Sequence, residues 1–297
     1  MFDYRLLEAL ERVGEFASFE RAAQRLGITQ SAISQRISTL EHRVGKLLVR
    51  RGRPIELTEA GVQLANHLSR VKLLETDLSE IYSADNLNSS MKIAVNADSI
   101  ATWWFQVLAT FLQNENLTLG VVIEDQSEGL KHLSEGQVVG CLCSSDTTLS
   151  GSRCHYVGSM RYRFYCSQFF YSKHFSSGVT ENSLVKAPAV SFGNKDEIHT
   201  DALVAMGINC FPNFFTCPSS EGLMNILAAG VGYGVLPELQ VMKYPHNHLV
   251  DIFPDHPSIM IPLYWHYWRE GGQLLERLTN SLVSAKAKRI VEYSDFT

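Results

Sequence analysis

The chain has 297 residues, about twice the length of a typical domain, so we expect two folded units. Hydrophobic residues make up 45% of the sequence and charged residues 19%, which excludes intrinsic disorder and allows a sizeable core. No apolar run reaches the roughly 18 residues that a membrane span needs, and the N-terminus does not resemble a secretion signal. We therefore expect a cytoplasmic protein, with its six scattered cysteines reduced and not paired in disulfides.

The net charge of -5 is unevenly distributed along the sequence. From Ser18 to Arg53, eight basic residues outnumber two acidic ones, a local balance of +6, so the remainder of the chain carries -11. A basic N-terminal segment on an acidic remainder is typical of a nucleic-acid-binding domain joined to a domain with another role. Charged runs also occur on ordinary solvated helix faces, so the motifs must decide between the two interpretations.

Three short helices are predicted in the first 45 residues. Asp3 should cap the first helix, which should end at Gly14, and Ser18 should cap the second, which should end at Gly27. Thr29 should cap the third helix. Its apolar positions recur at helical spacing, at Ile33, Ile37, Leu40 and Val44. The second and third helices flank a turn of about three residues, which is the helix-turn-helix pattern.

The opposite face of the third predicted helix carries short or amide side chains that fit the major groove of DNA. Glutamine can bond to adenine, arginine to guanine, and serine to base edges or phosphate. An ordinary polar helix surface is the alternative interpretation. The basic turn that follows the helix predicts a hairpin wing against the DNA backbone. The DNA-binding candidates are Thr29, Gln30, Ser31, Ser34, Gln35 and Arg36 in the helix and Arg50, Arg51 and Arg53 in the wing.

A long helical pattern begins at Thr58 and continues to Ile81. A helix of about 27 residues would span about 40 Å, which is longer than a small winged domain. We therefore expect its apolar stripe to pack against a second copy of the chain, since two-fold protein symmetry also matches DNA with two half-sites. The stripe consists of Leu64, Leu68, Val71, Leu74 and Leu78.

Beyond residue 90, short apolar runs alternate with helical patterns, which predicts an α/β domain with a parallel sheet. The expected strands form two sets, 92–96, 118–124 and 138–143 in the first and 163–167, 189–192 and 213–217 in the second. A C-terminal helix from about residue 273 to 289 should pack against the first set of strands. Two crossings between the sets would create two lobes with a cleft between them.

These features together resemble the LysR-type transcriptional regulators. The resemblance rests on SFERAAQRL at 18–26, TQSAISQRI at 29–37, LE at 40–41 and LTEAG at 57–61. It implies a winged helix-turn-helix, a long linker helix and a two-lobed effector domain like the periplasmic solute-binding proteins. AVNADSIATW at 94–103, VVG at 138–140 and LYWH at 263–266 further resemble the members that respond to arginine and lysine.

The resemblance sets the expected domains and function. The winged helix-turn-helix domain should cover 1–58, the linker and dimerisation helix 59–90, and the effector-binding domain 91–297. Lobe I should comprise about 91–161 and 268–297, and lobe II about 162–267. The implied protein binds operator DNA in response to L-lysine or L-arginine and controls genes of amino-acid transport or metabolism. Its implied partners are double-stranded DNA, further copies in a homodimer or homotetramer, and RNA polymerase, with no membrane and no cofactor.

The effector-binding candidates lie at strand ends and helix starts, where ligands of open α/β sheets are found. A ligand carboxylate could bind at Ser99 and Thr102, and its cationic groups could face the acidic residues. Serines that only cap helices and acidic residues that only face solvent are the alternatives, and both stay open. The candidates are Asp98, Ser99, Thr102, Glu124, Asp125, Ser219, Ser220 and Glu221.

Other functions have weaker support in the sequence. No catalytic pattern appears, so no enzyme is expected, and Cys141-x-Cys143 lacks the further ligands that zinc requires. A regulator that senses another small molecule, or thiol oxidation through Cys141, Cys143, Cys154 or Cys166, remains open. A solute-binding protein is the remote alternative, because it would need a secretion signal and no DNA-binding segment.

Overall fold

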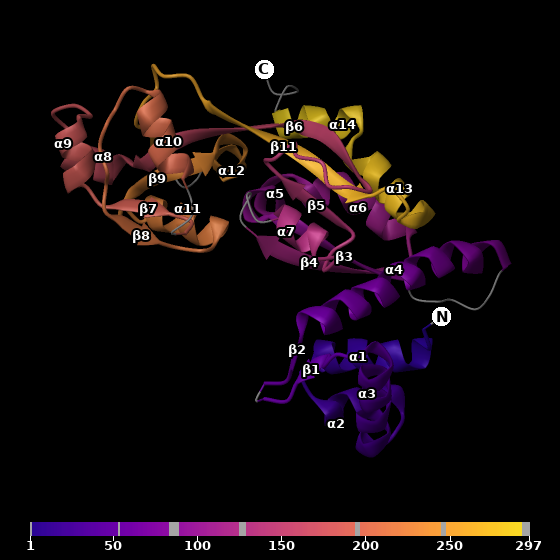
Figure 1. Cartoon of the computed structure of the whole chain (residues 1–297). Coiled ribbons are helices and arrows are strands. Elements are labelled where there is room, and N and C mark those ends of the chain that lie inside the picture. Colours follow the sequence, from indigo (N-terminus) through magenta and orange to yellow (C-terminus); the bar gives the residue numbers. More distant parts are fainter. Residues whose placement is uncertain are drawn as a thin grey trace.

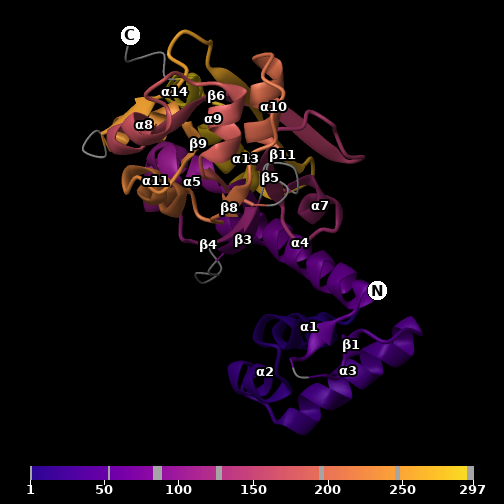
Figure 2. The same ribbon diagram turned by 90° about the vertical axis from the view of Figure 1, so that its left-hand side faces the viewer.

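The structure is a computed structural model that describes residues 2–52, 54–82, 89–124, 129–193, 197–244 and 248–292. A helical head at the N-terminus and a larger α/β body form its two parts. Helix α4 (Glu59–Tyr82) lies between them in both views (Figures 1 and 2). None of the helices in the described ranges has the length and apolar character that crossing a membrane requires.

The head contains three helices and a hairpin, as the sequence predicted: α1 (Tyr4–Phe16), α2 (Phe19–Leu26), α3 (Gln30–Val44), β1 (Val49–Arg50) and β2 (Glu56–Leu57). The side chains of Asp3, Ser18 and Thr29 each accept a backbone N–H in the first turn of their helix. Gly27 ends α2 at φ 64°, a conformation that favours glycine. The strands β1 and β2 pair antiparallel, which confirms the winged form of the motif.

The predicted end of the first helix at Gly14 is wrong, because α1 continues to Phe16. A β-carbon at Gly14 would lie 2.6 Å from Cδ1 of Leu57 in β2. Glycine at this position therefore allows the wing to pack closely on α1. The helix ends instead at Ala17, which takes the left-handed conformation with φ 49°.

The first half of the α4 stripe packs on the head of the same chain. Leu68 is 2% exposed and belongs to the head core with Leu7, Leu10 and Ile37. Leu64 is partly buried against the same core. The expectation that the whole stripe needs a second copy is therefore wrong for these two leucines. Further along α4, Val71 is half-buried and Leu74 is 44% exposed, and the side chain of Leu78 lies outside the described part.

The body is built on one mixed sheet of nine strands among the described residues, in the order β4-β3-β5-β11-β6-β9-β7-β8, with β10 paired to β6. Pairing is parallel at the two ends, in β4-β3-β5 and β9-β7-β8, and antiparallel in the centre. The strands are β3 (Ser89–Asn96), β4 (Leu117–Glu124), β5 (Gly140–Cys143), β6 (Ser152–Ser167), β7 (Ala189–Ser191), β8 (Phe214–Thr216), β9 (Tyr233–Pro237), β10 (Leu249–Asp251) and β11 (Ile259–Trp268).

Helices cover each half of this sheet and define two lobes. Lobe I carries α5 (Ala97–Thr102), α6 (Trp104–Asn114), α7 (Gly129–Ser134), α13 (Gly272–Leu282) and α14 (Ala285–Glu292). Lobe II carries α8 (Gln168–His174), α9 (Glu181–Lys186), α10 (Ile198–Ala205), α11 (Ser220–Ala228) and α12 (Glu238–Lys243). The largest core of lobe I contains three tryptophans, Trp103, Trp104 and Trp265, whereas a core of lobe II contains Phe164, Phe170 and Phe175.

Two long strands join the lobes (Figure 1). Tyr162 of β6 packs in the core of lobe I, and Phe164, two residues further on, packs in a core of lobe II. The chain crosses back from lobe II to lobe I within β11 and not near residue 268, because Leu263 and Trp265 already belong to the core of lobe I. The sheet is therefore mixed where a parallel sheet was expected, and the expected single C-terminal helix is divided into α13 and α14.

Candidate DNA interface and candidate effector site

The N-terminal half of α3 presents a polar surface beside the wing. Thr29 caps the helix, accepting the backbone N–H of Ala32 at 3.2 Å, and its hydroxyl lies 2.9 Å from that of Ser31. Gln30, Ser31 and Gln35 are exposed. The predicted residues Ser34 and Arg36 are half-buried. Three of the predicted side chains of α3 are therefore exposed, and two are half-buried.

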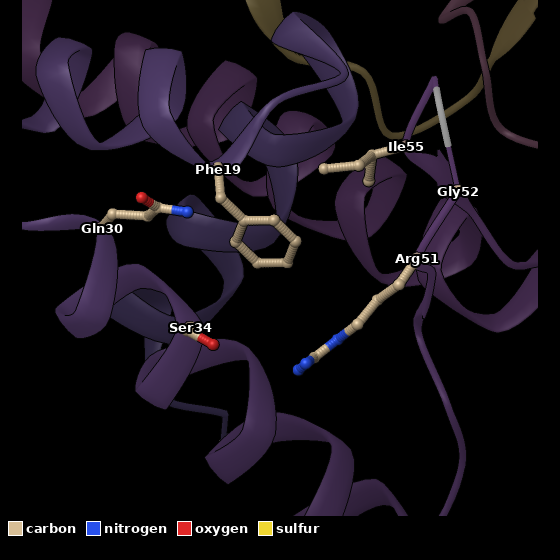
Figure 3. A pocket seen from close by; sticks show the side chains of 6 residues that line it. All are labelled: Phe19, Gln30, Ser34, Arg51, Gly52 and Ile55. Carbon is tan, nitrogen blue, oxygen red and sulfur yellow. The ribbon is translucent and has the colours of Figure 1, made fainter.

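A surface hollow of about 490 Å³ lies between this part of α3, the start of α2 and the wing (Figure 3). Its lining consists of Phe19, Gln30, Ser34, Arg51, Gly52 and Ile55. The Phe19 ring lies between the Gln30 amide, the Ser34 hydroxyl and the Arg51 side chain in Figure 3, and the Arg51 guanidinium carbon is 5.9 Å from its centroid. An apolar floor surrounded by an amide, a hydroxyl and a cation suits the sugar, phosphate and base edges of DNA.

The wing is held to α3 by Glu41, which sequence reasoning had not assigned a role. One carboxylate oxygen of Glu41 accepts the backbone N–H of Leu48 at 2.8 Å and that of Val49 at 3.3 Å. These bonds fix the start of β1 relative to α3. Arg50 and Arg51 in the wing are exposed, and Arg53 lies outside the described residues.

The second group of candidates meets where the two lobes touch. Asp98 lies in the first turn of α5, and one of its carboxylate oxygens accepts the Tyr162 hydroxyl of β6 at 2.9 Å. The other oxygen accepts the Ser220 hydroxyl of α11, in lobe II, at 2.7 Å. Gln240, which is buried, donates its amide N–H to the Ser220 carbonyl at 3.1 Å. The structure therefore brings Asp98 and Ser220 together and adds Tyr162 and Gln240.

Ser99 and Thr102 do not present free hydroxyl groups to lobe II. Ser99 is fully buried, and its hydroxyl accepts the indole N–H of Trp103 at 3.1 Å and lies 3.7 Å from the sulfur of Met160. Thr102 donates its hydroxyl to the Asp98 carbonyl at 2.5 Å. Both hydroxyls are used inside lobe I, which differs from the expectation that they contact a ligand carboxylate.

The remaining candidates have different surroundings. Ser219 caps α11 by accepting the backbone N–H of Gly222 at 3.1 Å, and Glu221 is exposed in the first turn of this helix. Glu124 ends β4, where its backbone lies opposite Asn96, while Asp125 falls outside the described residues. The capping alternative therefore describes the Ser219 side chain well.

Asn96 is a further polar residue at this junction that sequence reasoning missed. It is 2% exposed, and neither atom of its amide has a hydrogen-bond partner within the described ranges. It precedes α5 without capping it. Its place at the end of β3, two residues before Asp98, was a usable signal. Tyr162 and Gln240 gave no such signal, because only the fold brings β6 and α12 to Asp98.

All six cysteines are free thiols. In the part of the chain that the structure describes, no group of three or more His, Cys, Asp or Glu residues is arranged to hold a metal ion.

Comparisons with known proteins agree with the fold and identify the family. The family of bacterial regulatory helix-turn-helix proteins of the lysR type matches residues 4–62. A curated relative from Pseudomonas fluorescens is 45% identical over 295 residues, which is 98% of this chain and 99% of the relative. The chain therefore belongs to the LysR family of transcriptional regulators. The resemblance that the sequence motifs indicated is thereby confirmed.

The relatives also define a group within the family. The Pseudomonas fluorescens protein is the HTH-type transcriptional regulator ArgP. The crystal structure of ArgP from Mycobacterium tuberculosis is similar with a TM-score of 0.79 at 32% identity, over 97% of this chain and 98% of that one. Full-length LysG from Corynebacterium glutamicum with bound effector Arg has a TM-score of 0.67 at 28% identity, over 96% and 98% of the two chains.

Proposed function

We propose that this transcriptional regulator reads operator DNA with α3 and the wing and changes its operator binding when L-arginine or L-lysine binds between its lobes. The observation that carries the proposal is the Asp98 carboxylate, held by hydroxyls from β6 and from lobe II at the point where the lobes meet. The proposal keeps the domain division expected from the sequence, with the head at 1–58, the linker at 59–90 and the effector domain at 91–297, although β3 already begins at Ser89.

For DNA, the proposal assigns different tasks to helix and wing. Gln30, Ser34, Gln35 and Arg36 read base edges, because they lie on the polar side of α3 at its N-terminal half. Thr29 and Ser31 contact phosphate near the start of the helix. The arginines of the wing, Arg50, Arg51 and Arg53, contact backbone phosphates, which positions the protein without selecting a sequence.

For the effector, the proposal rests on charge and on buried polar groups. The α-ammonium of a basic amino acid displaces a hydroxyl from Asp98 and forms a charge-assisted hydrogen bond there. The buried Asn96 amide supplies a donor for the ligand carboxylate, and leaving such an amide unpaired is unfavourable. Glu221, next to Ser220 in α11, supplies negative charge for the distal cation, and Glu124 and Asp125 are the further acidic candidates that the sequence offers. The arginine bound to LysG supports this choice of effector.

The same site couples the effector to DNA. A ligand shifts a conformational equilibrium only by its difference in affinity for the two states, and a ligand that contacts both lobes has such a difference. The relative placement of two heads in a dimer then changes. We place the dimer contact on the outer half of α4, where Leu74 is exposed, with homotetramers and contact with RNA polymerase as further assembly in the cytoplasm.

Selection from random duplex DNA, followed by affinity measurements, tests this function. We expect enrichment of one sequence pattern with two half-sites, bound at least 1,000-fold more tightly than random duplex, on the order of specific regulators. L-arginine or L-lysine should change the affinity for the selected duplex by about 5- to 150-fold, the usual range of coupling between two sites. L-Norleucine, which lacks the distal cation, is the control. Equal binding of all duplexes, or no effect of either basic amino acid, would overturn the proposal.

A further inference from the structure

Lys243 is a cation at the junction of the two lobes that the proposed function does not use. It lies in the last turn of α12, in lobe II. Its ammonium group donates a hydrogen bond to the carbonyl of Thr102, the last residue of α5 in lobe I. Among the residues that the structure describes, no carboxylate forms an ion pair with this ammonium group. The charge of Lys243 is therefore available to an anionic group of a ligand.

The helices α5 and α12 contact each other and place the Lys243 ammonium about one helical turn from the Asp98 carboxylate (Figure 1). Asp98 precedes Thr102 by four residues in α5, and Gln240 precedes Lys243 by three in α12. Both spacings keep two side chains on one face of a helix, and four residues rise about 6 Å. Gln240 bonds to Ser220, which donates to Asp98. The junction therefore has an acidic end at Asp98 and a basic end at Lys243.

The Lys243 ammonium group has lost part of its hydration but stays within reach of a ligand. Desolvation at the junction lowers the pKa of Lys243. The residue as a whole is exposed, so a ligand can approach it from solvent. An ammonium group has three N–H donors, and the Thr102 carbonyl accepts from one of them. Further donors can therefore bind a ligand while the contact between the lobes is kept.

A buried amide lies in the chain close to the acidic end of the junction. Asn96 ends β3, two residues before Asp98, and is 2% exposed. Neither atom of its amide has a hydrogen-bond partner in the described part of the chain. A buried polar group without a partner is unfavourable, so a polar ligand at this place would stabilise it. This amide is a second observation, independent of Lys243, that points to a ligand here.

We propose, on the basis of the function proposed above, that Lys243 binds the carboxylate of the effector, so that Asp98 and Lys243 together select an α-amino acid. The α-ammonium group of the ligand bonds to Asp98. The ligand carboxylate, which is attached to the same α-carbon, accepts charge-assisted hydrogen bonds from Lys243. A ligand in this position contacts lobe I through Asp98 and lobe II through Lys243. It therefore favours the arrangement in which the two lobes touch.

A ligand without the negative charge tests this assignment in the full-length protein. L-Argininamide keeps both cationic groups of L-arginine but has an uncharged amide in place of the carboxylate. Calorimetric titrations at about pH 6.5, where α-amino groups are protonated, compare the two ligands. The unmodified chain should bind L-arginine at least 10-fold more tightly than L-argininamide, the usual size of a hydrogen bond between charged groups. L-Lysine and L-lysinamide are compared in the same way.

The variant Lys243→Met should reduce this preference to less than about 3-fold, because L-arginine binds more weakly while L-argininamide binds about as before. Lys186→Met is the matched control, since Lys186 is also an exposed lysine in the last turn of a short helix of lobe II. It should keep the full preference. Lys243→Arg, which keeps the charge, should keep most of it.

The outcomes separate this assignment from a purely structural role of Lys243. If Lys243 only holds the lobes together, Lys243→Met should weaken both ligands by the same factor and leave the preference unchanged. That result, or equal binding of acid and amide by the unmodified chain, would overturn the assignment while the proposed function stands. Absence of binding of both L-arginine and L-lysine to the unmodified chain would overturn the proposed function and the role of Lys243 with it.

Discussion

Asp98 and His199 show how strongly the surroundings of one side chain decide its role. The Asp98 carboxylate is surrounded by hydroxyl donors from two elements, which suits a charged acceptor. His199, by contrast, is 1% exposed among the rings of Phe164, Phe214 and Tyr233, and neither of its ring nitrogens has a partner within the described ranges. Burial lowers the pKa of His199 to about 3.

This pKa predicts a dependence of stability on pH. Below about pH 6.5, histidine in the unfolded chain takes up a proton and buried His199 does not. The free energy of unfolding therefore decreases as the pH is lowered, by about 1.4 kcal/mol per pH unit. His199→Leu should remove about 2 kcal/mol of the difference in unfolding free energy between about pH 7.5 and about pH 5. Urea unfolding of both proteins at the two pH values measures this difference. An equal decrease in the free energy of unfolding between the two pH values in both proteins would contradict the prediction.

Two single substitutions in the head should have different effects on DNA binding. Arg51→Ala removes a phosphate contact, so affinity should fall equally for operator and random duplex, and the slope of log affinity against log salt should decrease by about one. Gln30→Ala removes base reading, so operator affinity should fall by about 1–3 kcal/mol with random duplex nearly unchanged. Salt titrations with both duplexes measure these effects. Equal losses on both duplexes for Gln30→Ala would contradict the base-reading role.

Helix α4 shows how one element can serve two surfaces. Its first half closes the head core with Leu68, whereas Leu74 further along is exposed in the single chain. The helix also contacts lobe I, because Asn66 donates its amide N–H to the Glu135 carbonyl at 2.7 Å. The Arg70 guanidinium carbon lies 5.6 Å from the ring centroid of Trp268 in β11.

The two leucines form a matched pair for testing α4. Leu68→Ala should lower the free energy of unfolding of the head by about 2–5 kcal/mol, because it opens a cavity in a buried core. Leu74→Ala should change the stability of the single chain by no more than about 0.5 kcal/mol, because its side chain is partly in solvent. It should, however, weaken the dimer. Chemical unfolding and sedimentation equilibrium measure the two effects, and an unchanged dimer constant for Leu74→Ala would refute this assignment of the interface.

Local signals predicted the head, whereas long-range pairing determined much of the body. The caps Ser18 and Thr29 and the turn at Gly27 act within one helical turn, so their spacing was sufficient. Gly14 was misinterpreted because its close neighbour, Leu57, is distant in sequence. The first part of β6 was missed for a related reason. It pairs antiparallel with β11, more than 90 residues later in the sequence, and no local pattern announces that partner.

The same distinction applies to the candidate site. Asp98 and Ser220 were predicted because each follows a strand end or begins a helix. The prediction that the Ser99 hydroxyl faces a ligand failed against the packing of Trp103 and Met160, which use that hydroxyl inside lobe I. Tyr162 lies in the middle of a strand that continues from one lobe into the other, so its position near Asp98 depends on the whole topology.

At the scale of the whole molecule, two continuous strands and several polar contacts connect the two lobes among the described residues. β6 and β11 continue from one lobe to the other. The Asp98 carboxylate of lobe I also joins the two lobes by its hydrogen bond with Ser220 of lobe II. Lys243 of α12 adds a hydrogen bond from its ammonium group to the Thr102 carbonyl. A ligand that replaces one of these polar contacts therefore acts on the relative placement of the lobes, and α4 connects that placement to the head.

Calorimetric titration of the purified chain with L-arginine and L-lysine, compared between the unmodified protein and Asp98→Asn, tests the central claim most directly. The account predicts that at least one of the two amino acids binds, and that Asp98→Asn weakens its binding at least 10-fold. Glu197→Gln, an exposed acidic residue at the start of α10, is the matched control and should bind the ligand normally. Absence of heat with both amino acids, or equal affinity in the Asp98 variant, would contradict the account.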